Sequence, residues 1–140
     1  MMPVVIAPLT LALLLASCAS ASVQRVQEPP PPEGTVVLAI GTPQRAPGSE
    51  LTVAFEAVVA DSRCPIGVQC IWAGDAAVRL RLSAPNLAHT TATLHTNLDT
   101  AKETTYAGWK VSLQAVTPAP TADAAVRADD YRVTLLIVRK

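Results

Sequence analysis

The side chains that could carry nucleophilic, redox or metal chemistry are few. They are three cysteines and two histidines: Cys18, Cys64, Cys70, His89 and His95. Five residues separate Cys64 from Cys70, whereas a redox-active pair at a helix start, where a thiol pKa is lowered, has only two residues between its cysteines. On one strand, at about 3.3 Å per residue, the two histidines would lie about 20 Å apart, too far to share an ion. We therefore expect no metal site, no cofactor and exposed histidines.

Other catalytic patterns are also missing from the sequence. It has no glycine-rich phosphate loop, no Gly-x-Ser-x-Gly elbow and no His-Glu-x-x-His motif. Asp61, Asp75, Asp129 and Asp130 could pair in space, but carboxylates at turns and strand ends more often cap backbone groups than act as acids. Eleven basic and eleven acidic residues are interspersed along the chain, so no nucleic-acid surface is expected. We predict a protein without catalytic residues.

The N-terminus has the pattern of a signal peptide. The segment from Val4 to Ala16 is almost wholly apolar. As a helix it would reach about 20 Å, short of the roughly 30 Å hydrocarbon core of a bilayer. It ends in Leu15-Ala16-Ser17-Cys18, which resembles the lipobox of bacterial lipoproteins. The resemblance implies a signal peptide over residues 1–17 and a membrane anchor through lipid on Cys18.

One feature departs from that pattern, because residues 1–17 contain no Lys or Arg. The alternative is an N-terminal helix packed in the core, with Cys18 as an ordinary thiol. Ala19 and Ser20 stand where an aspartate retains some lipoproteins at the inner membrane. We therefore expect a lipid-anchored envelope protein, on the outer membrane and facing the periplasm if the host has one.

Residues 18–33 form a proline-rich linker. The run Pro29-Pro30-Pro31-Pro32 between two glutamates fixes backbone φ angles and favours polyproline II. A proline-rich recognition ligand is the alternative, but basic flanking residues do not accompany the prolines, so a spacer is the better interpretation.

Residues 34–140 are of the right length for one domain, and their apolar residues alternate with a period of two. Five segments alternate clearly, and a sixth is apolar throughout; in order they are Val36–Ile40, Leu51–Val59, Val78–Leu82, Thr91–His95, Trp109–Ala115 and Tyr131–Ile137. Turn residues separate the segments. This predicts an all-β fold, an antiparallel β-sandwich of about six to seven strands, immunoglobulin-like in general architecture. The expected core includes Phe55, Trp109, Val111, Leu113, Val133 and Leu135.

The segment Asp61-Ser62-Arg63-Cys64-Pro65 followed by Cys70-Ile71-Trp72-Ala73-Gly74 is the most specific local motif. It resembles a segment of small, exported, mostly uncharacterised bacterial proteins, many of them lipoproteins, and the resemblance implies a fold and a compartment but no activity. With Cys18 lipidated, Cys64 and Cys70 remain as an even pair in an exported domain, which predicts a disulfide.

We expect this loop to be the contact surface, with Asp61, Arg63, Trp72 and Asp75 as its candidate binding residues. Arg63 is expected to pair with Asp61, and Trp72 to cover the disulfide; alternatively, Arg63 and Trp72 form a ligand-binding rim. Two functional classes stay open. The first is a non-catalytic envelope module that binds another envelope protein or has a structural role. The second is a small-ligand or carbohydrate-binding accessory domain, which a cleft rimmed by Trp72, Trp109 or Tyr106 would favour.

Overall fold

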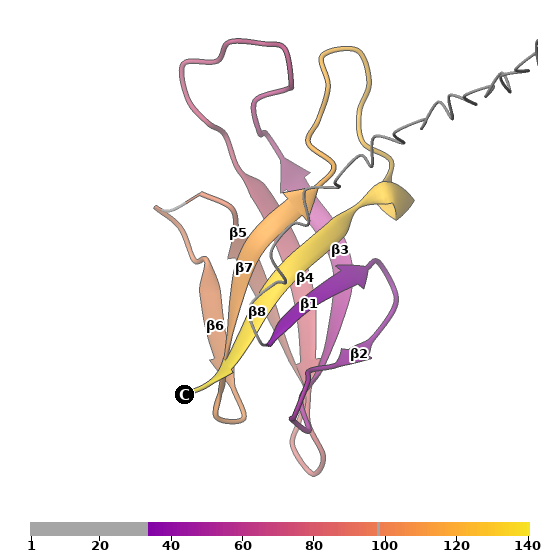
Figure 1. The fold of residues 1–140 in the computed structure, drawn as a ribbon, viewed down its shortest axis with the longest axis vertical. Coiled ribbons are helices and arrows are strands. Elements are labelled where there is room, and N and C mark those ends of the chain that lie inside the picture. The colour runs from indigo at the N-terminus through magenta and orange to yellow at the C-terminus, as the bar shows by residue number, and fades with distance from the viewer. Residues whose placement is uncertain (1–33, 98) are drawn as a thin grey trace, which may run out of the picture.

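The computed structural model describes residues 34–97 and 99–140, which form two packed sheets (Figure 1). The expected signal peptide (1–17), the lipidation site Cys18 and the linker (18–33) lie outside the described residues. The strands are β1 (Thr35–Ala39), β2 (Gln44–Arg45), β3 (Thr52–Asp61), β4 (Ala76–Ser83), β5 (Thr90–His95), β6 (Glu103–Tyr106), β7 (Trp109–Thr117) and β8 (Arg132–Arg139), with a short 3₁₀ helix η1 (Ala128–Asp130) before β8.

Each sheet has four antiparallel strands. One has the order β1-β8-β7-β6 and the other β2-β3-β4-β5. The chain therefore passes from the first sheet to the second after β1 and returns at β6. The predicted all-β sandwich is confirmed, with eight strands rather than six or seven.

The two extra strands are short and polar. β2 consists of Gln44 and Arg45, which are both exposed, and β6 reads Glu-Thr-Thr-Tyr. Neither has an apolar alternation, since both residues of β2 are exposed and only Tyr106 of β6 packs against the core. The pairing of β2 with β3 and of β6 with β7 determines both strands.

The core fills the space between the sheets with alternating aliphatic side chains. Its buried members include Val36, Leu38, Leu51, Val53, Phe55, Val78, Leu80, Leu82, Leu94, Val111, Leu113, Val116, Tyr131, Val133, Leu135 and Ile137. Each fully buried aliphatic or aromatic side chain contributes about 1.5–3 kcal/mol by transfer from water. Of the six core residues expected from the sequence, five are fully buried. Trp109 is half-buried and packs against the edge of the core.

In β3 and β7, the residues that face the core do not follow the alternation of the sequence along the whole strand. In β3 the register shifts between Phe55 and Ala57 and again between Val58 and Ala60. Val58 consequently packs against the core, while Val59, expected on the inner face, is 47% exposed. A shift after Leu113 in β7 likewise buries Val116. A β-bulge adds one residue to one strand and so reverses the side-chain alternation beyond it.

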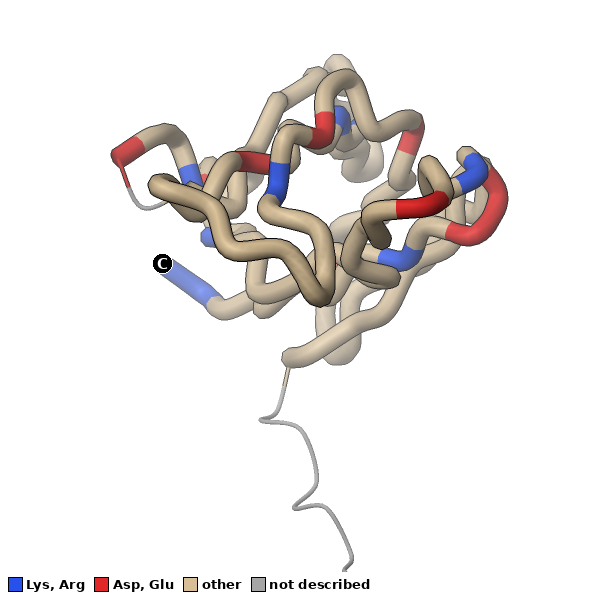
Figure 2. The backbone as a smooth tube through the Cα atoms, turned by 90° about the horizontal axis from the view of Figure 1, so that it is seen from above, with Lys and Arg blue, Asp and Glu red and all other residues tan. Residues whose placement is uncertain are grey.

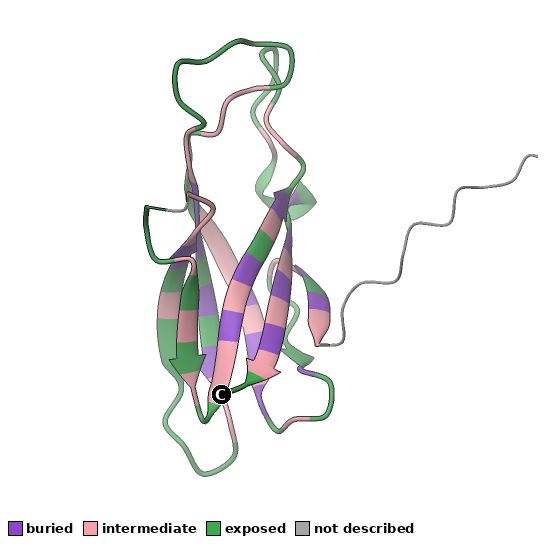
Figure 3. Ribbon diagram, turned by 60° about the vertical axis from the view of Figure 1, so that its left-hand side comes forward, coloured by how far each residue is buried: buried purple, intermediate pink, exposed green. Residues whose placement is uncertain are grey.

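Long loops gather at one end of the sandwich and tight turns at the other. β3 and β7 both run toward the long-loop end, which carries residues 62–75 and 118–131 and is drawn at the top in Figure 1. Most of these two loops is exposed (Figure 3). Gly34, where the described domain begins, lies beside Ile137 near the far end of β8. None of the helices in residues 34–97 and 99–140 is both long and apolar enough to cross a membrane.

Candidate binding loop

Residues 62–75, here called the cysteine loop, extend the β3–β4 hairpin beyond the sheet. The Ser62 N–H donates to the Asp75 carbonyl at 2.7 Å, and the Cys64 N–H donates to the Ala73 carbonyl at 3.1 Å. This close approach requires Gly74. Its φ is +71°, and a Cβ atom there would lie 1.9 Å from the Ser62 carbonyl oxygen. The base of the loop is therefore a continuation of the β ladder.

The predicted disulfide is present. Cys64 and Cys70 are bonded, with their Cα atoms 5.9 Å apart. The bridge closes a ring that contains Pro65 and Gly67, residues suited to bends. It holds the outer half of the cysteine loop to the ladder at its base.

Arg63 ties the cysteine loop to the opposite sheet. Its guanidinium donates to both carboxylate oxygens of Asp61, at 2.9 and 2.7 Å, and also to the carbonyls of Val116 and Pro118. The Tyr131 hydroxyl donates to Asp61 at 2.9 Å. The expected Arg63–Asp61 pair is therefore confirmed, and it lies among residues from β3, from β7 and from the segment just before β8.

The charges in this network stabilise one another. Burial raises the pKa of Asp61, but hydrogen bonds from Arg63 and Tyr131 outweigh it, so the pKa lies below its ordinary value. The hydrogen bond to Asp61 raises the pKa of Arg63. Burial and the Asp61 carboxylate raise the pKa of Tyr131. Since each of the three guanidinium nitrogens of Arg63 donates to a protein oxygen, this side chain positions the loop rather than presenting a charge to a ligand.

Asp75, the fourth expected binding residue, belongs to a second hydrogen-bond network. One carboxylate oxygen lies 2.6 Å from Nδ1 of His95, and the other accepts from the Thr96 hydroxyl and the Asn97 N–H. Burial raises the pKa of Asp75, but the bonds from His95, Asn97 and Thr96 lower it below its ordinary value. His95 is half-buried in this network, so the expectation that both histidines are exposed is wrong for His95 and right for His89.

The outer part of the cysteine loop is apolar and exposed. Four side chains form this apolar tip: Ile66, Val68, Ile71 and Trp72. Ile71 is 94% exposed and Trp72 72%. The expectation that Trp72 covers the disulfide is therefore wrong, because the indole is open to solvent. The sequence did not identify the three aliphatic residues as candidate binding residues, because an apolar residue in a loop is ordinarily expected to fold inward.

A neighbouring loop supports the apolar tip. The Ile66 N–H donates to the Pro120 carbonyl at 2.9 Å, and Ile66 forms an isolated β-bridge with Thr121. Between Cys64 and Gly74 the chain carries no charged side chain. Figure 2, which looks onto this end of the molecule, shows long uncharged segments there, with acidic and basic residues around them. The disulfide, the ladder and the neighbouring loop thus hold apolar side chains in solvent.

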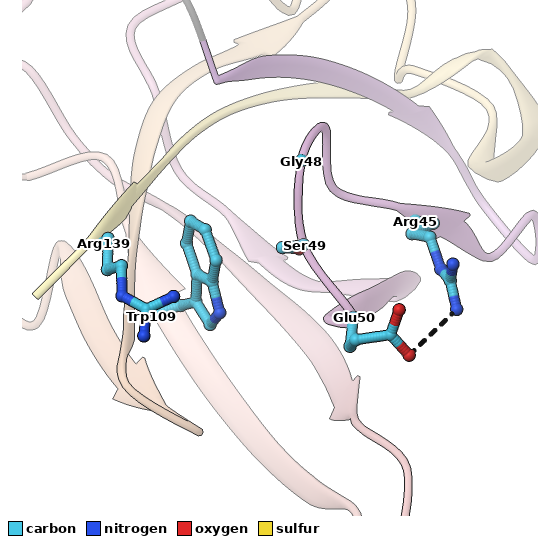
Figure 4. A pocket seen from close by; sticks show the side chains of 6 residues that line it. All are labelled: Arg45, Gly48, Ser49, Glu50, Trp109 and Arg139. Carbon is cyan, nitrogen blue, oxygen red and sulfur yellow. Dashed lines mark hydrogen bonds and ion pairs between the residues drawn. The ribbon is translucent and has the colours of Figure 1, made fainter.

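A cleft at the opposite end of the sandwich is the second candidate. It has a volume of about 480 Å³ and is lined by Arg45, Gly48, Ser49, Glu50, Trp109 and Arg139. The Arg139 guanidinium lies 5.7 Å from the Trp109 ring centroid. Arg45 pairs with Glu50 at 3.3 Å on one side of the cleft, and Trp109 and Arg139 lie on the other side (Figure 4). Of the three aromatic residues expected to rim a ligand cleft, Trp109 alone lines this one.

Comparisons with protein-family models, with curated proteins and with solved structures find no match to this chain. Within residues 34–97 and 99–140, no three His, Cys, Asp or Glu side chains come together in a group that could hold a metal ion. The geometry of the cysteine loop and of the Trp109 cleft is therefore the basis for a functional assignment.

Proposed function

We propose that this chain is a lipid-anchored bacterial envelope protein whose β-sandwich binds another envelope component without catalysing a reaction. The observation that carries the proposal is the solvent exposure of the apolar tip on a loop that is otherwise fixed. Ile71 and Trp72 add little to the stability of the fold, because both side chains are exposed to solvent. Exposed apolar side chains that gather on one loop are typical of a contact surface.

The rigidity of the cysteine loop supports the same function. A loop already held by a disulfide and by Arg63 loses little conformational entropy when it binds. The Leu15-Ala16-Ser17-Cys18 sequence and the proline-rich linker supply the anchor and the spacer. The resemblance to exported lipoproteins with the Asp-Ser-Arg-Cys-Pro segment favours an exported compartment. Ala19 and Ser20, in place of an aspartate, favour the outer membrane, facing the periplasm, if the host has one.

The test replaces the four residues of the apolar tip by serine while keeping both cysteines. The control variant carries Val37→Ser and Leu87→Ser, which change two exposed apolar residues outside the loop. After crosslinking in intact cells, we expect the loop variant to lose the adducts that the parent and the control form. If the loop variant forms the same adducts as the parent, the contact surface lies outside the apolar tip. Turnover of a substrate in a hydrolase screen, abolished by Asp75→Asn, would overturn the non-catalytic assignment.

The Trp109 cleft supports a second candidate function, the binding of a small ligand or carbohydrate. An indole face beside guanidinium donors is suited to stack on a sugar ring and to bond its hydroxyl groups. In a Trp72→Phe background Trp109 is the only tryptophan, so its fluorescence would report binding of mono- and disaccharides. A saturable change, lost in Arg139→Ala, would support this function, and an unchanged spectrum would exclude the sugars tested.

A further inference from the structure

We propose that the component contacted by the apolar tip is the surface of a lipid bilayer, into which Ile71 and Trp72 insert at the depth of the headgroups. This inference rests on the proposed function and names its partner. Three observations point to lipid rather than to a protein surface: the lack of charge in the loop, the small size of the tip, and the length of chain between the anchor and the domain.

The chemistry of the loop suits the membrane interface. The eleven residues from Cys64 to Gly74 include no acid or base, so no charge has to be desolvated when the tip enters. Arg63, at the base of the loop, is bound by Asp61 and two backbone carbonyls. Tryptophan is enriched at bilayer interfaces because its ring is apolar and its N–H remains near water. Trp72 and Ile71 are the most exposed large apolar side chains of the described chain.

The tip is too small for a stable protein interface. Stable complexes bury about 800 Å² on each partner, from some 20–30 residues, with a polar rim around an apolar centre. The tip offers four apolar side chains, without a charged rim within the loop. The loop that carries them is exposed and protrudes beyond the sheets (Figure 3). A bilayer needs only a few inserted side chains when a second attachment already holds the protein at the membrane.

The linker is long enough for both attachments at once. The domain begins at Gly34, whose carbonyl accepts from the Ile137 N–H at 3.0 Å. Ile137 is five residues along β8 from Arg132, and the apolar tip lies up to seven residues beyond Asp61 at the end of β3, which together make at most about 40 Å at about 3.3 Å per residue. The sixteen residues 18–33 could span about 50 Å at about 3.1 Å per residue. A lipid on Cys18 and the apolar tip can therefore reach the same membrane.

The surroundings of the tip specify the kind of lipid. Four exposed aspartates, Asp99, Asp123, Asp129 and Asp130, and one exposed arginine, Arg127, lie on the loops at this end, so acidic residues are in excess there. This excess of negative charge would be repelled by an anionic surface. The occupant is therefore a zwitterionic surface, such as phosphatidylethanolamine mixed with phosphatidylcholine.

The two tryptophans, at opposite ends of the domain, provide the test. The processed full chain is reconstituted in phosphatidylethanolamine–phosphatidylcholine vesicles whose acyl chains carry bromine, a contact quencher of indole fluorescence. In the Trp109→Phe variant the emission comes from Trp72, and we expect at least twofold quenching. In the Trp72→Phe variant the emission comes from Trp109, and we expect it to be unchanged. Adding phosphatidylglycerol at low salt should reduce the quenching of Trp72.

A pair of charge variants separates insertion from mere proximity. In the Trp109→Phe background, Ile71→Asp should abolish the quenching of Trp72, whereas Leu87→Asp, at the tight-turn end, should leave it unchanged. Equal or absent quenching of the two tryptophans would overturn the lipid inference. If a photocrosslinker at position 71 then still forms a protein adduct, the proposed function stands with a protein or a second copy of the chain as the partner. If it forms no adduct, both proposals fail.

Discussion

Arg63 and Asp61 determine where the cysteine loop lies, because the pair connects β3 to the strand ends of the other sheet. The side chains retain only 15% and 11% of their exposure, whereas those of the Arg45–Glu50 pair retain 61% and 68%. Removing one partner of a largely buried pair leaves the other charge and its acceptors unsatisfied. Exposed pairs contribute little, because water solvates both groups after separation.

We predict that Arg63→Ala lowers the free energy of unfolding by about 2–3 kcal/mol. The matched Arg45→Ala variant should change it by less than about 0.5 kcal/mol. Urea unfolding of both variants gives the comparison. Equal effects would mean that the Arg63 network does not hold the loop.

Asp61 makes part of the stability dependent on pH. Its pKa lies below the ordinary 3.8 when the protein is folded, so folding favours the ionised form. The stabilisation is complete above the pKa of the unfolded chain and is lost as the pH falls through the folded pKa. We predict that Asp61→Asn lowers stability at pH 7 and flattens the decline between about pH 5 and pH 2. Denaturant unfolding at stepped pH measures this, and a decline as steep as the parent's would assign it to other groups.

At the scale of the elements, the ladder at the base of the cysteine loop depends on one glycine. Gly74 and Gly67 both have positive φ. Of the two, only Gly74 lies so close to other backbone atoms that an added Cβ atom would clash with them. We predict that Gly67→Ala costs about 1 kcal/mol for its backbone conformation alone. Gly74→Ala should cost about 3 kcal/mol or more, because the added carbon must displace Ser62. Thermal unfolding compares the two variants. Similar losses of stability would show that the ladder at the base of the loop can open at little cost.

The disulfide should stabilise the domain modestly because its ring is short. We predict that the double variant Cys64→Ser/Cys70→Ser unfolds with a free energy lower by about 2 kcal/mol. Mass spectrometry of protein alkylated before and after reduction should find one intramolecular bridge in the parent. An unchanged urea midpoint in the double variant would contradict the structural role.

The elements also show what the sequence could predict. Strands such as β4 and β8 were predictable because alternating apolar residues face a single core. The bulges in β3 and β7 were not, because pairing with the neighbouring strand decides where an extra residue is accommodated. In the loop, the short spacing of Asp61 and Arg63 predicted their pairing. The partners of Arg63 at β7 and of Asp75 at β5 come from distant parts of the chain, so no local sequence pattern could predict them.

At the scale of the whole molecule, the proposed anchor, linker and domain act together. We predict that Cys18→Ala moves the protein from the membrane fraction to soluble or unprocessed forms, because the lipid on that cysteine is lost. Fractionation of cells that express the parent and the variant measures this. Unchanged membrane distribution with normal processing would contradict lipidation at Cys18.

We propose that the apolar tip of the cysteine loop is the surface through which this protein contacts another envelope component. The most direct measurement introduces a photocrosslinking residue at Ile71 or at Leu87, both exposed but at opposite ends of the domain. The crosslinks are formed by illumination of intact cells. We predict lipid or protein adducts at position 71 and none above background at position 87. Adducts absent from position 71, or equally abundant at both positions, would contradict the claim.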